Sequence, residues 1–331
     1  MIINSLLEAL SIGILIPFLT VIFNDINNGN INQYFENFLG YFNLEKSNLN
    51  ILYILFIIYV LKYIYIFVYS KIQTTFIGNL KTDLQSKMFQ GYMNRSYQFH
   101  SKVNSSTLIS NISSEVSKFT NLYLGPILQI ALHTLVTIFI ILALLAVNFK
   151  ATVIVVIIFL FCVSVTTLLF SKKLSKIGEL NQHHDRSTLR YMRQGLVGMV
   201  ETKILSLQKV YTEKHFFHTD NRVKLGITRY MIALFPKIFF EFVFLSIVFA
   251  LIIFAEITQS ISTKDIFLTL VIYAAAAMRV MPSLAAITQA YQKIKYANPS
   301  TKLVIEEFES FKEKRIDSIK LSKNSFKKIN F

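Results

Sequence analysis

Six apolar segments, each long enough to cross a lipid bilayer as a helix, restrict this chain to the folds of a membrane protein. They cover residues 2–23, 51–70, 122–147, 152–170 and 231–257, and the last begins at residue 266. A helix needs about 20 apolar residues to span the hydrocarbon core. Hydrophobic residues make up 53% of the chain and the mean hydropathy is +0.49, high values for a water-soluble protein. The sequence therefore predicts an all-α membrane protein with six transmembrane helices.

Two connections between these segments are long and keep a helical pattern of apolar residues. After residue 70, Ile72, Phe76, Leu80, Leu84 and Met88 repeat at four-residue intervals among charged residues. This stripe is typical of an amphipathic helix, and a leg of about 25 residues would extend roughly 35–40 Å. The connection between the fourth and fifth segments shows a similar pattern. We expect two long helical hairpins outside the membrane.

Basic residues are concentrated in these two long connections. The short connections on the opposite side carry only Lys46, Lys150 and Lys264. Because basic residues favour the cytoplasmic side of a membrane, we expect cytoplasmic hairpins and cytoplasmic termini in a multi-pass protein of the cell (inner) membrane. The net charge of +15 follows from this topology, so we expect no nucleic-acid partner.

The order of these segments, together with two sequence stretches, resembles the transmembrane half of ABC exporters (the type IV fold). ISNISSEVSKFTNLY, residues 109–123, resembles the stretch after that family's first coupling helix, with Glu115 where an acidic residue is usual. QGLVGMVETKILSLQKVYTEKHF, residues 194–216, resembles the second coupling segment, with Gly198 and Lys203 at the matching places. The resemblance implies six spans and two long cytoplasmic hairpins, and it covers nearly the whole chain.

Three further stretches resemble the branch of this family that includes lipid-linked oligosaccharide flippases. They are LLEALSIGILIPFLTVIF at residues 6–23, FPKIFFE at 235–241 and AAAAMRVMPSLAAITQAYQKIKYANPS at 274–300. The implied function is ATP-driven export or flipping of an amphipathic, lipid-linked, oligosaccharide-like substrate across the inner membrane. Two alternatives stay open: a lipid, drug or peptide exporter of another branch, and a six-span sensor or assembly protein without a motor.

The chain departs from the family by lacking a G-x-x-x-x-G-K-[ST] phosphate-binding loop. We therefore expect a transmembrane domain at residues 1–295, and at 296–331 a linker with the first residues of a truncated nucleotide-binding domain. No catalytic residue, cofactor or metal is assigned to this chain, because ATP and Mg²⁺ would bind in the missing domain of an ATP-hydrolysing parent. The expected partners are a second copy of the chain, a nucleotide-binding domain that lies either downstream or on a separate chain, and membrane lipid or lipid-linked substrate.

Arg279 is the first candidate for the substrate pathway. It follows four consecutive alanines and precedes Pro282 by three residues within an apolar helix. An arginine at that depth is costly unless it faces protein or water, and its guanidinium suits a phosphate group. The alternative is a buried ion pair with Glu8 or Glu241 that fixes helix packing.

Three further charged residues of the apolar segments complete the candidate pathway. Lys237 and Glu241 lie four residues apart on one helix, where they could contact substrate or neutralise each other. Lys62 lies near the middle of the second segment, and we favour a structural role for it.

The tips of the two hairpins are the candidate contacts with the motor domain, because a stiff two-helix leg can transmit a rigid-body movement. In the alternative interpretation the tips are ordinary solvated loops. The predicted coupling residues are Ser96, Tyr97, Gln98, Phe99 and His100 at the first tip, and Gly195, Leu196, Val197, Gly198 and Met199 at the second.

Metal-ligating residues are sparse in this sequence. The single cysteine, Cys162, lies in an apolar segment and excludes both an intrachain disulfide and a cysteine-based metal cluster. The neighbouring histidines His183 and His184 fall on a long cytoplasmic helix, and we expect no metal site there.

Overall fold

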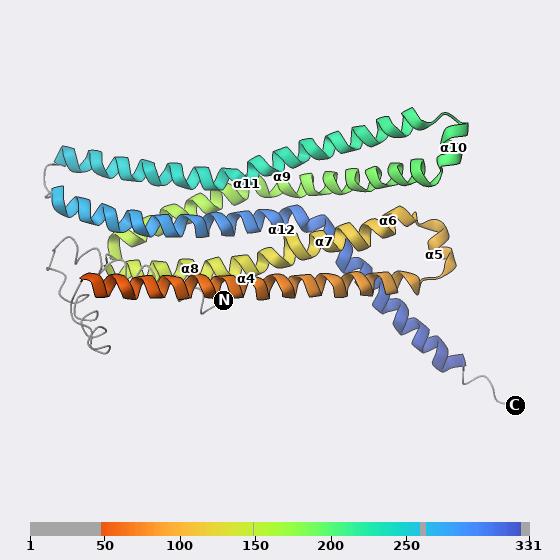
Figure 1. The fold of residues 1–331 in the computed structure, drawn as a ribbon, viewed down its shortest axis with the longest axis horizontal. Helices are drawn as coiled ribbons and strands as arrows, with labels where there is room; N and C mark the ends of the chain where they lie inside the picture. The colour runs from red at the N-terminus through yellow and green to blue at the C-terminus, as the bar shows by residue number, and fades with distance from the viewer. Residues whose placement is uncertain (1–47, 148, 259–262, 326–331) are drawn as a thin grey trace. The chain divides into compact units, whose positions relative to one another are not determined.

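A computed structural model of the chain describes residues 48–147, 149–258 and 263–325, and every regular element within these ranges is a helix (Figure 1). The first expected span, residues 2–23, and the C-terminal residues 326–331 lie outside the described residues. The elements in chain order are α4 (Asn48–Met93), α5 (Tyr97–Lys102), α6 (Ser105–Ser110), η1 (Asn111–Glu115), α7 (Val116–Phe119), η2 (Thr120–Leu124), α8 (Gly125–Val147), α9 (Phe149–Val197), α10 (Met199–Ile204), α11 (Gln208–Thr258) and α12 (Thr263–Ser325).

The helices are long because each apolar segment continues into its amphipathic leg without a break, as the unbroken stripes predict. α4, α9 and α11 have 46, 49 and 51 residues. Among the described residues, three continuous helical stretches are long and apolar enough to cross a membrane: Ser105–Leu142, Thr152–Val197 and Gln208–Ala250. A predominantly helical membrane protein is thereby confirmed, while the count of six spans stays a prediction.

Each hairpin turns at a short helix. α5 joins α4 to the returning helices, and α10 joins α9 to α11 (Figure 1). The returning leg after α5 contains two π-helical turns, η1 and η2. A π-helical turn inserts one residue into the α-helical repeat and shifts the faces of the residues that follow. Glu115, the last residue of η1, has a fully buried side chain.

The chain divides into two compact units, and each is considered by itself. The first, which we call the membrane unit, comprises Met1–Thr74, Leu128–Thr166 and Leu234–Gln289 and holds most of the expected spans. Its described core is apolar and consists of Leu132, Val136, Ile140, Phe159, Cys162, Phe240, Val280, Leu284 and Ala285. α12 continues through Pro282 without a break.

The second unit, the leg unit, comprises Thr75–Ile127, Thr167–Ala233 and Ala290–Phe331. It has two apolar clusters: one around Met88, Tyr92, Leu108, Val116 and Val304, and one around Leu174, Ile177, Ile232 and Tyr296. At Gly178, α9 lies so close to α12 that an added Cβ would overlap the Tyr296 carbonyl oxygen. The boundary expected between residues 295 and 296 falls inside α12, which continues to Ser325.

Candidate functional site

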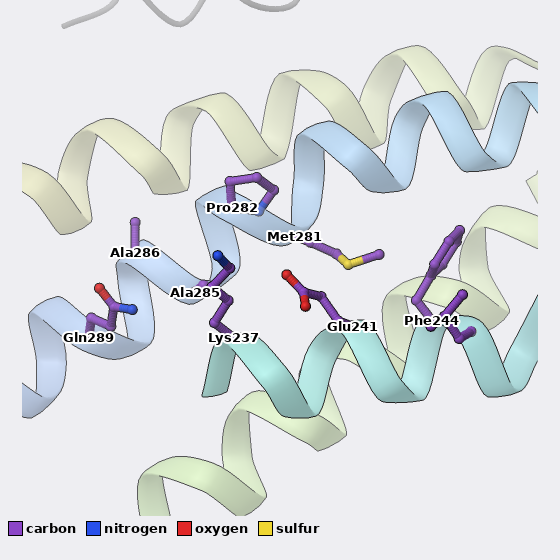
Figure 2. A pocket seen from close by; sticks show the side chains of 9 residues that line it. Lys237, Glu241, Phe244, Met281, Pro282, Ala285, Ala286 and Gln289 are labelled. Atoms are coloured by element: carbon purple, nitrogen blue, oxygen red, sulfur yellow. The ribbon is translucent and has the colours of Figure 1, made fainter. Parts of the chain in front are cut away.

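A cavity of about 670 Å³ lies between α11 and α12 in the membrane unit. Most of its lining is apolar, and the charges come from Lys237 and Glu241. Figure 2 shows both charged side chains pointing from α11 toward α12. The lining residues are Lys237, Glu241, Phe244, Leu245, Met281, Pro282, Ala285, Ala286 and Gln289. A mostly apolar wall with a few polar groups is typical of small-molecule sites.

The two charges of this cavity are not neutralised by each other. Their four-residue spacing allows an ion pair, but among the described residues Lys237 and Glu241 form neither an ion pair nor a hydrogen bond. Pro236, directly before Lys237, is buried inside α11. The cavity therefore offers one cation and one anion for a ligand with an apolar portion.

Of the other two candidate pathway residues, Lys62 is not among the described residues that line this cavity. Arg279 lies in α12, but its side chain is not among those that the structure describes. Lys62 is buried, with 1% of its side chain exposed, and its ammonium lies 5.5 Å from the ring centre of Tyr59 and 5.9 Å from that of Tyr63. A lysine in this aromatic setting gains cation–π stabilisation, and the structural role that we favour for Lys62 stays a prediction.

The first tip is the helix α5, and it closely matches the segment expected from the sequence. Ser96 precedes the helix as its N-cap residue, and Phe99 packs on the Met88–Tyr92 cluster. The Arg95 guanidinium lies 5.2 Å from the Phe99 ring centre, and the His100 ring bonds to the carbonyl oxygen of Tyr92 at 3.0 Å. Tyr97, in contrast, is 86% exposed.

The second tip lies slightly further along the chain than its sequence suggested. α9 continues through Gly195 and Leu196 to Val197, Gly198 is the N-cap residue, and the short crosswise helix α10 begins at Met199. The difference arises because Gly195 does not interrupt α9, which ends at Val197 directly before Gly198. α10 ends at Ile204. Ser206 follows with a positive φ of 54°, the left-handed conformation that often follows a helix C-terminus.

An open hollow of about 480 Å³ lies next to the two tips within the leg unit. The first hairpin contributes the chain after α5, and the second contributes the end of α9 and the start of α11. The Arg193 side chain lines this hollow, and its buried Nη1 atom has no hydrogen-bond partner among the described residues. The residues that surround the hollow are Val103, Asn104, Ser105, Ser106, Arg193, Gln194, Val197, Gly198 and Tyr211.

A buried charged network holds α7 and η1 to α9 and α11 in the leg unit. The Lys118 ammonium donates to the Asp185 carboxylate at 2.6 Å and to Glu115 at 3.2 Å. Glu115 also accepts a hydrogen bond of 2.7 Å from Gln182, and Arg222 of α11 forms an ion pair with Asp185. Burial by itself would lower the pKa of Lys118, but the two carboxylates outweigh burial and raise it.

This network was only partly visible in the sequence. The resemblance singled out Glu115, but nothing in the periodicity indicated that Gln182 and Asp185, which lie 67 residues from Glu115 and Lys118 respectively, would meet this segment. The one sequence feature that suggested contact with another helix was that Gln182 and Asp185 lie on the same side of α9 as its apolar residues.

Comparison with protein families identifies the kind of membrane protein to which these helices belong. A family model described as the ABC transporter transmembrane region matches residues 2–293. Comparison with curated proteins finds no match. The matched region covers most of the 331-residue chain, and membrane domains of this family work with a nucleotide-binding partner. The chain belongs to the family of ABC transporter transmembrane regions.

Proposed function

We propose that this chain is the transmembrane half of an ATP-driven exporter or flippase that moves an amphipathic, lipid-linked substrate across the inner membrane. Two copies would pair around a central pathway, and a nucleotide-binding domain would drive them through the hairpin tips. The family assignment favours this hypothesis over a sensor or assembly protein without a motor. A lipid, drug or peptide exporter remains the alternative within transport.

The α11–α12 cavity carries the substrate part of this proposal. Its volume of about 670 Å³ lies within the range of about 300–1,000 Å³ that is usual for small-molecule sites. The Lys237 ammonium, without an ion partner among the described residues, can bind a phosphate oxygen through a charge-assisted hydrogen bond. The apolar lining accommodates a hydrocarbon portion. Lipid-linked sugars combine these two features, and oligosaccharide-like headgroups are the class we favour.

The hairpin tips support the motor part of the proposal. Several large apolar side chains are exposed around the second tip, including Val197 at 77%, Ile204 at 75% and Leu196 at 66%. Apolar groups exposed on a polar leg are typical of a surface that another protein covers. The unpartnered Nη1 of Arg193 in the adjacent hollow would donate a hydrogen bond to a carboxylate or carbonyl oxygen of that protein.

A reconstitution experiment tests the substrate assignment. The chain, together with its nucleotide-binding domain, is placed in proteoliposomes, and ATP-dependent transfer of a fluorescent lipid-linked saccharide between leaflets is measured. Lys237→Gln should reduce transfer about ten- to hundredfold at low substrate concentration, because a charged hydrogen bond contributes about 1.5–3 kcal/mol. Lys224→Gln, an exposed lysine of the leg unit that pairs with Asp220, is the matched control and should transfer normally.

Two outcomes separate the alternatives. A phosphate-free analogue whose transfer is equally sensitive to Lys237→Gln would contradict the phosphate contact. ATP-dependent transfer of a drug or peptide, with none of the lipid-linked saccharide, would assign the chain to another exporter branch.

The tips are tested in the same preparation. Replacing Tyr97 and Phe99 by alanine, or residues 195–199 by a Gly-Ser sequence, should leave membrane insertion intact while ATP hydrolysis no longer drives transfer. Normal transfer in both variants would remove the coupling assignment.

A further inference from the structure

Three histidines from two helices of the leg unit come together, two of them adjacent in sequence and the third distant. His183 and His184 lie on α9, and His218 lies on α11. Each offers one ring nitrogen, and these three nitrogens all lie within 4.8 Å of one another. The Nδ1 atoms of His184 and His218 are 2.9 Å apart. We propose that these three side chains form a binding site for a divalent transition-metal ion, Zn²⁺ in the first instance, that bridges α9 and α11.

The spacing of the nitrogens is close to what such an ion requires. With Zn–N distances of about 2.0–2.1 Å, the nitrogens of a tetrahedral zinc lie roughly 3.3 Å apart. The His184–His218 separation of 2.9 Å is slightly shorter than this value, and no separation exceeds 4.8 Å, so modest rotations of the side chains bring all three nitrogens into range. Imidazole ligands suit Zn²⁺, Cu²⁺ and Ni²⁺, whereas Mg²⁺ and Ca²⁺ prefer oxygen. The fourth position would be open to water.

The surroundings of the cluster are compatible with metal binding. Burial, followed by the neighbouring histidines, lowers the pKa of His218 and of His184 below 6.5, and the neutral ring is the form that binds metal. The Tyr191 ring stacks on His218, with centroids 5.5 Å apart and an angle of 20° between the ring planes. Asp185 follows His184 directly in the chain, and its negative charge opposes the lowering of the His184 pKa. His183 is exposed and gives an ion access from solvent.

The sequence led us to expect no metal here because the adjacent pair His183 and His184 falls on a long cytoplasmic helix. His218 lies 34 residues after His184, and only the packing of α11 against α9 adds the third ligand. An ion in this place would tie together the two legs that end at α10. It would thereby stiffen the second hairpin, whatever substrate the transporter moves.

Zinc titration of the purified full chain, prepared without a histidine tag, tests this proposal. Isothermal calorimetry should show one Zn²⁺ per chain, and thermal unfolding should shift upward with zinc concentration. His218→Ala should weaken binding by at least ~100-fold, because even partners outside the ligand shell change affinity by about 10–100-fold. His215→Ala is the matched control: it removes a histidine one turn away on α11 that is not in the cluster, and it should bind as the wild type does.

A second measurement identifies the ligands without relying on the stability of a variant. Co²⁺ bound to the wild-type chain should give a visible spectrum of a low-coordinate nitrogen site, and Zn²⁺ should displace it. Wild-type protein that binds neither ion, or binds both equally well after His184→Gln and His218→Gln, would overturn the proposal and leave a hydrogen-bonded histidine pair.

Discussion

Buried polar side chains form different hydrogen bonds in the membrane unit and in the leg unit, although the same long helices run through both. In the membrane unit, the described core cluster is apolar, and the hydroxyls of Thr137, Thr166 and Thr288 bond to carbonyls of their own helix. In the leg unit, buried polar groups bond between helices: Lys118 to Asp185, and Gln182 to Glu115.

The solvent around each unit explains this difference. Lipid tails are as apolar as leucine, so helices in a membrane associate through close packing more than through transfer of apolar surface out of water. Around the leg unit we expect water, where amphipathic helices bury apolar stripes and charged bonds between helices fix their register. The apolar periodicity of the sequence is similar in the two units. It does not reveal that close packing stabilises one unit, whereas apolar burial and charged hydrogen bonds between helices stabilise the other.

The largest effect on this comparison should come from Asp185. Asp185→Ala leaves the partly buried Lys118 with one carboxylate partner and Arg222 with none among the described residues. Breaking a buried pair costs about 3–5 kcal/mol, which sets the upper range here. The free energy of unfolding, measured by SDS titration, should fall accordingly. Asp83→Ala removes an exposed ion pair with Lys87 in the same unit and should change stability by less than about 1 kcal/mol. If Asp185→Ala and Asp83→Ala lowered the free energy of unfolding equally, burial of the network would not contribute to stability.

The pH dependence of this network has a defined sign. The pKa of Lys118 is raised above 10.5 in the fold, so its stabilisation is complete below pH 10.5 and is lost as the pH rises through the folded-state pKa. Unfolding measured between pH 8 and 12 should show this loss in the wild type. Lys118→Met should remove this part of the pH dependence.

Substitution of Arg279 should have the second-largest effect. It tests what a charged side chain contributes in the membrane unit. If Arg279 binds a phosphate headgroup, Arg279→Ala should reduce transport about ten- to hundredfold at normal stability, and Arg279→Lys should keep part of it. If it forms a buried ion pair, Arg279→Ala should cost about 3–5 kcal/mol, and neutralising Glu8 or Glu241 should partly restore stability. Transport and thermal stability measured on the same variants decide between the two.

Close packing between helices of the leg unit is tested at Gly178. Gly178→Ala places a Cβ against the Tyr296 carbonyl, so α9 and α12 must separate, at an expected cost of about 1–3 kcal/mol. Gly226→Ala on α11 is the matched control because nothing lies within 4 Å of its added Cβ. That change should stabilise the helix by about 0.5–1 kcal/mol. Destabilisation of the same size at both positions would contradict the close approach seen at Gly178.

The smallest effect is expected from a hydroxyl of the membrane unit. Thr166 is fully buried, and its hydroxyl donates to the carbonyl oxygens of Cys162 and Val163 on its own helix. Thr166→Val keeps the shape, and hydrogen bonds in membrane helices average only about 0.6 kcal/mol. A loss above about 2 kcal/mol in SDS unfolding would mean that this hydroxyl holds helices together.

The sequence by itself determined the helices and the place of the first tip. Apolar length and four-residue periodicity are local properties, so they predicted the long helix α4 through Ile72 and Met88, and the tip was expected at Ser96, where this pattern ends. The position of the second tip was predicted less accurately, because Gly195 does not interrupt α9 and only Gly198 follows its end. Tertiary packing decides where α9 ends. The sequence also named two residues of α11, Lys237 and Glu241, as candidates for the substrate pathway.

Only the tertiary structure decided which side chains meet. Asp185 and His218 lie on helices whose faces the sequence predicts, but their partners depend on how α9 packs against its neighbours and on the π-helical turn that ends at Glu115. The same holds for the cavity, which exists because α12 faces Lys237 and Glu241 across a gap. A periodic pattern fixes the rotation of one helix, whereas contacts require the relative rotation and depth of two helices, which no local pattern contains.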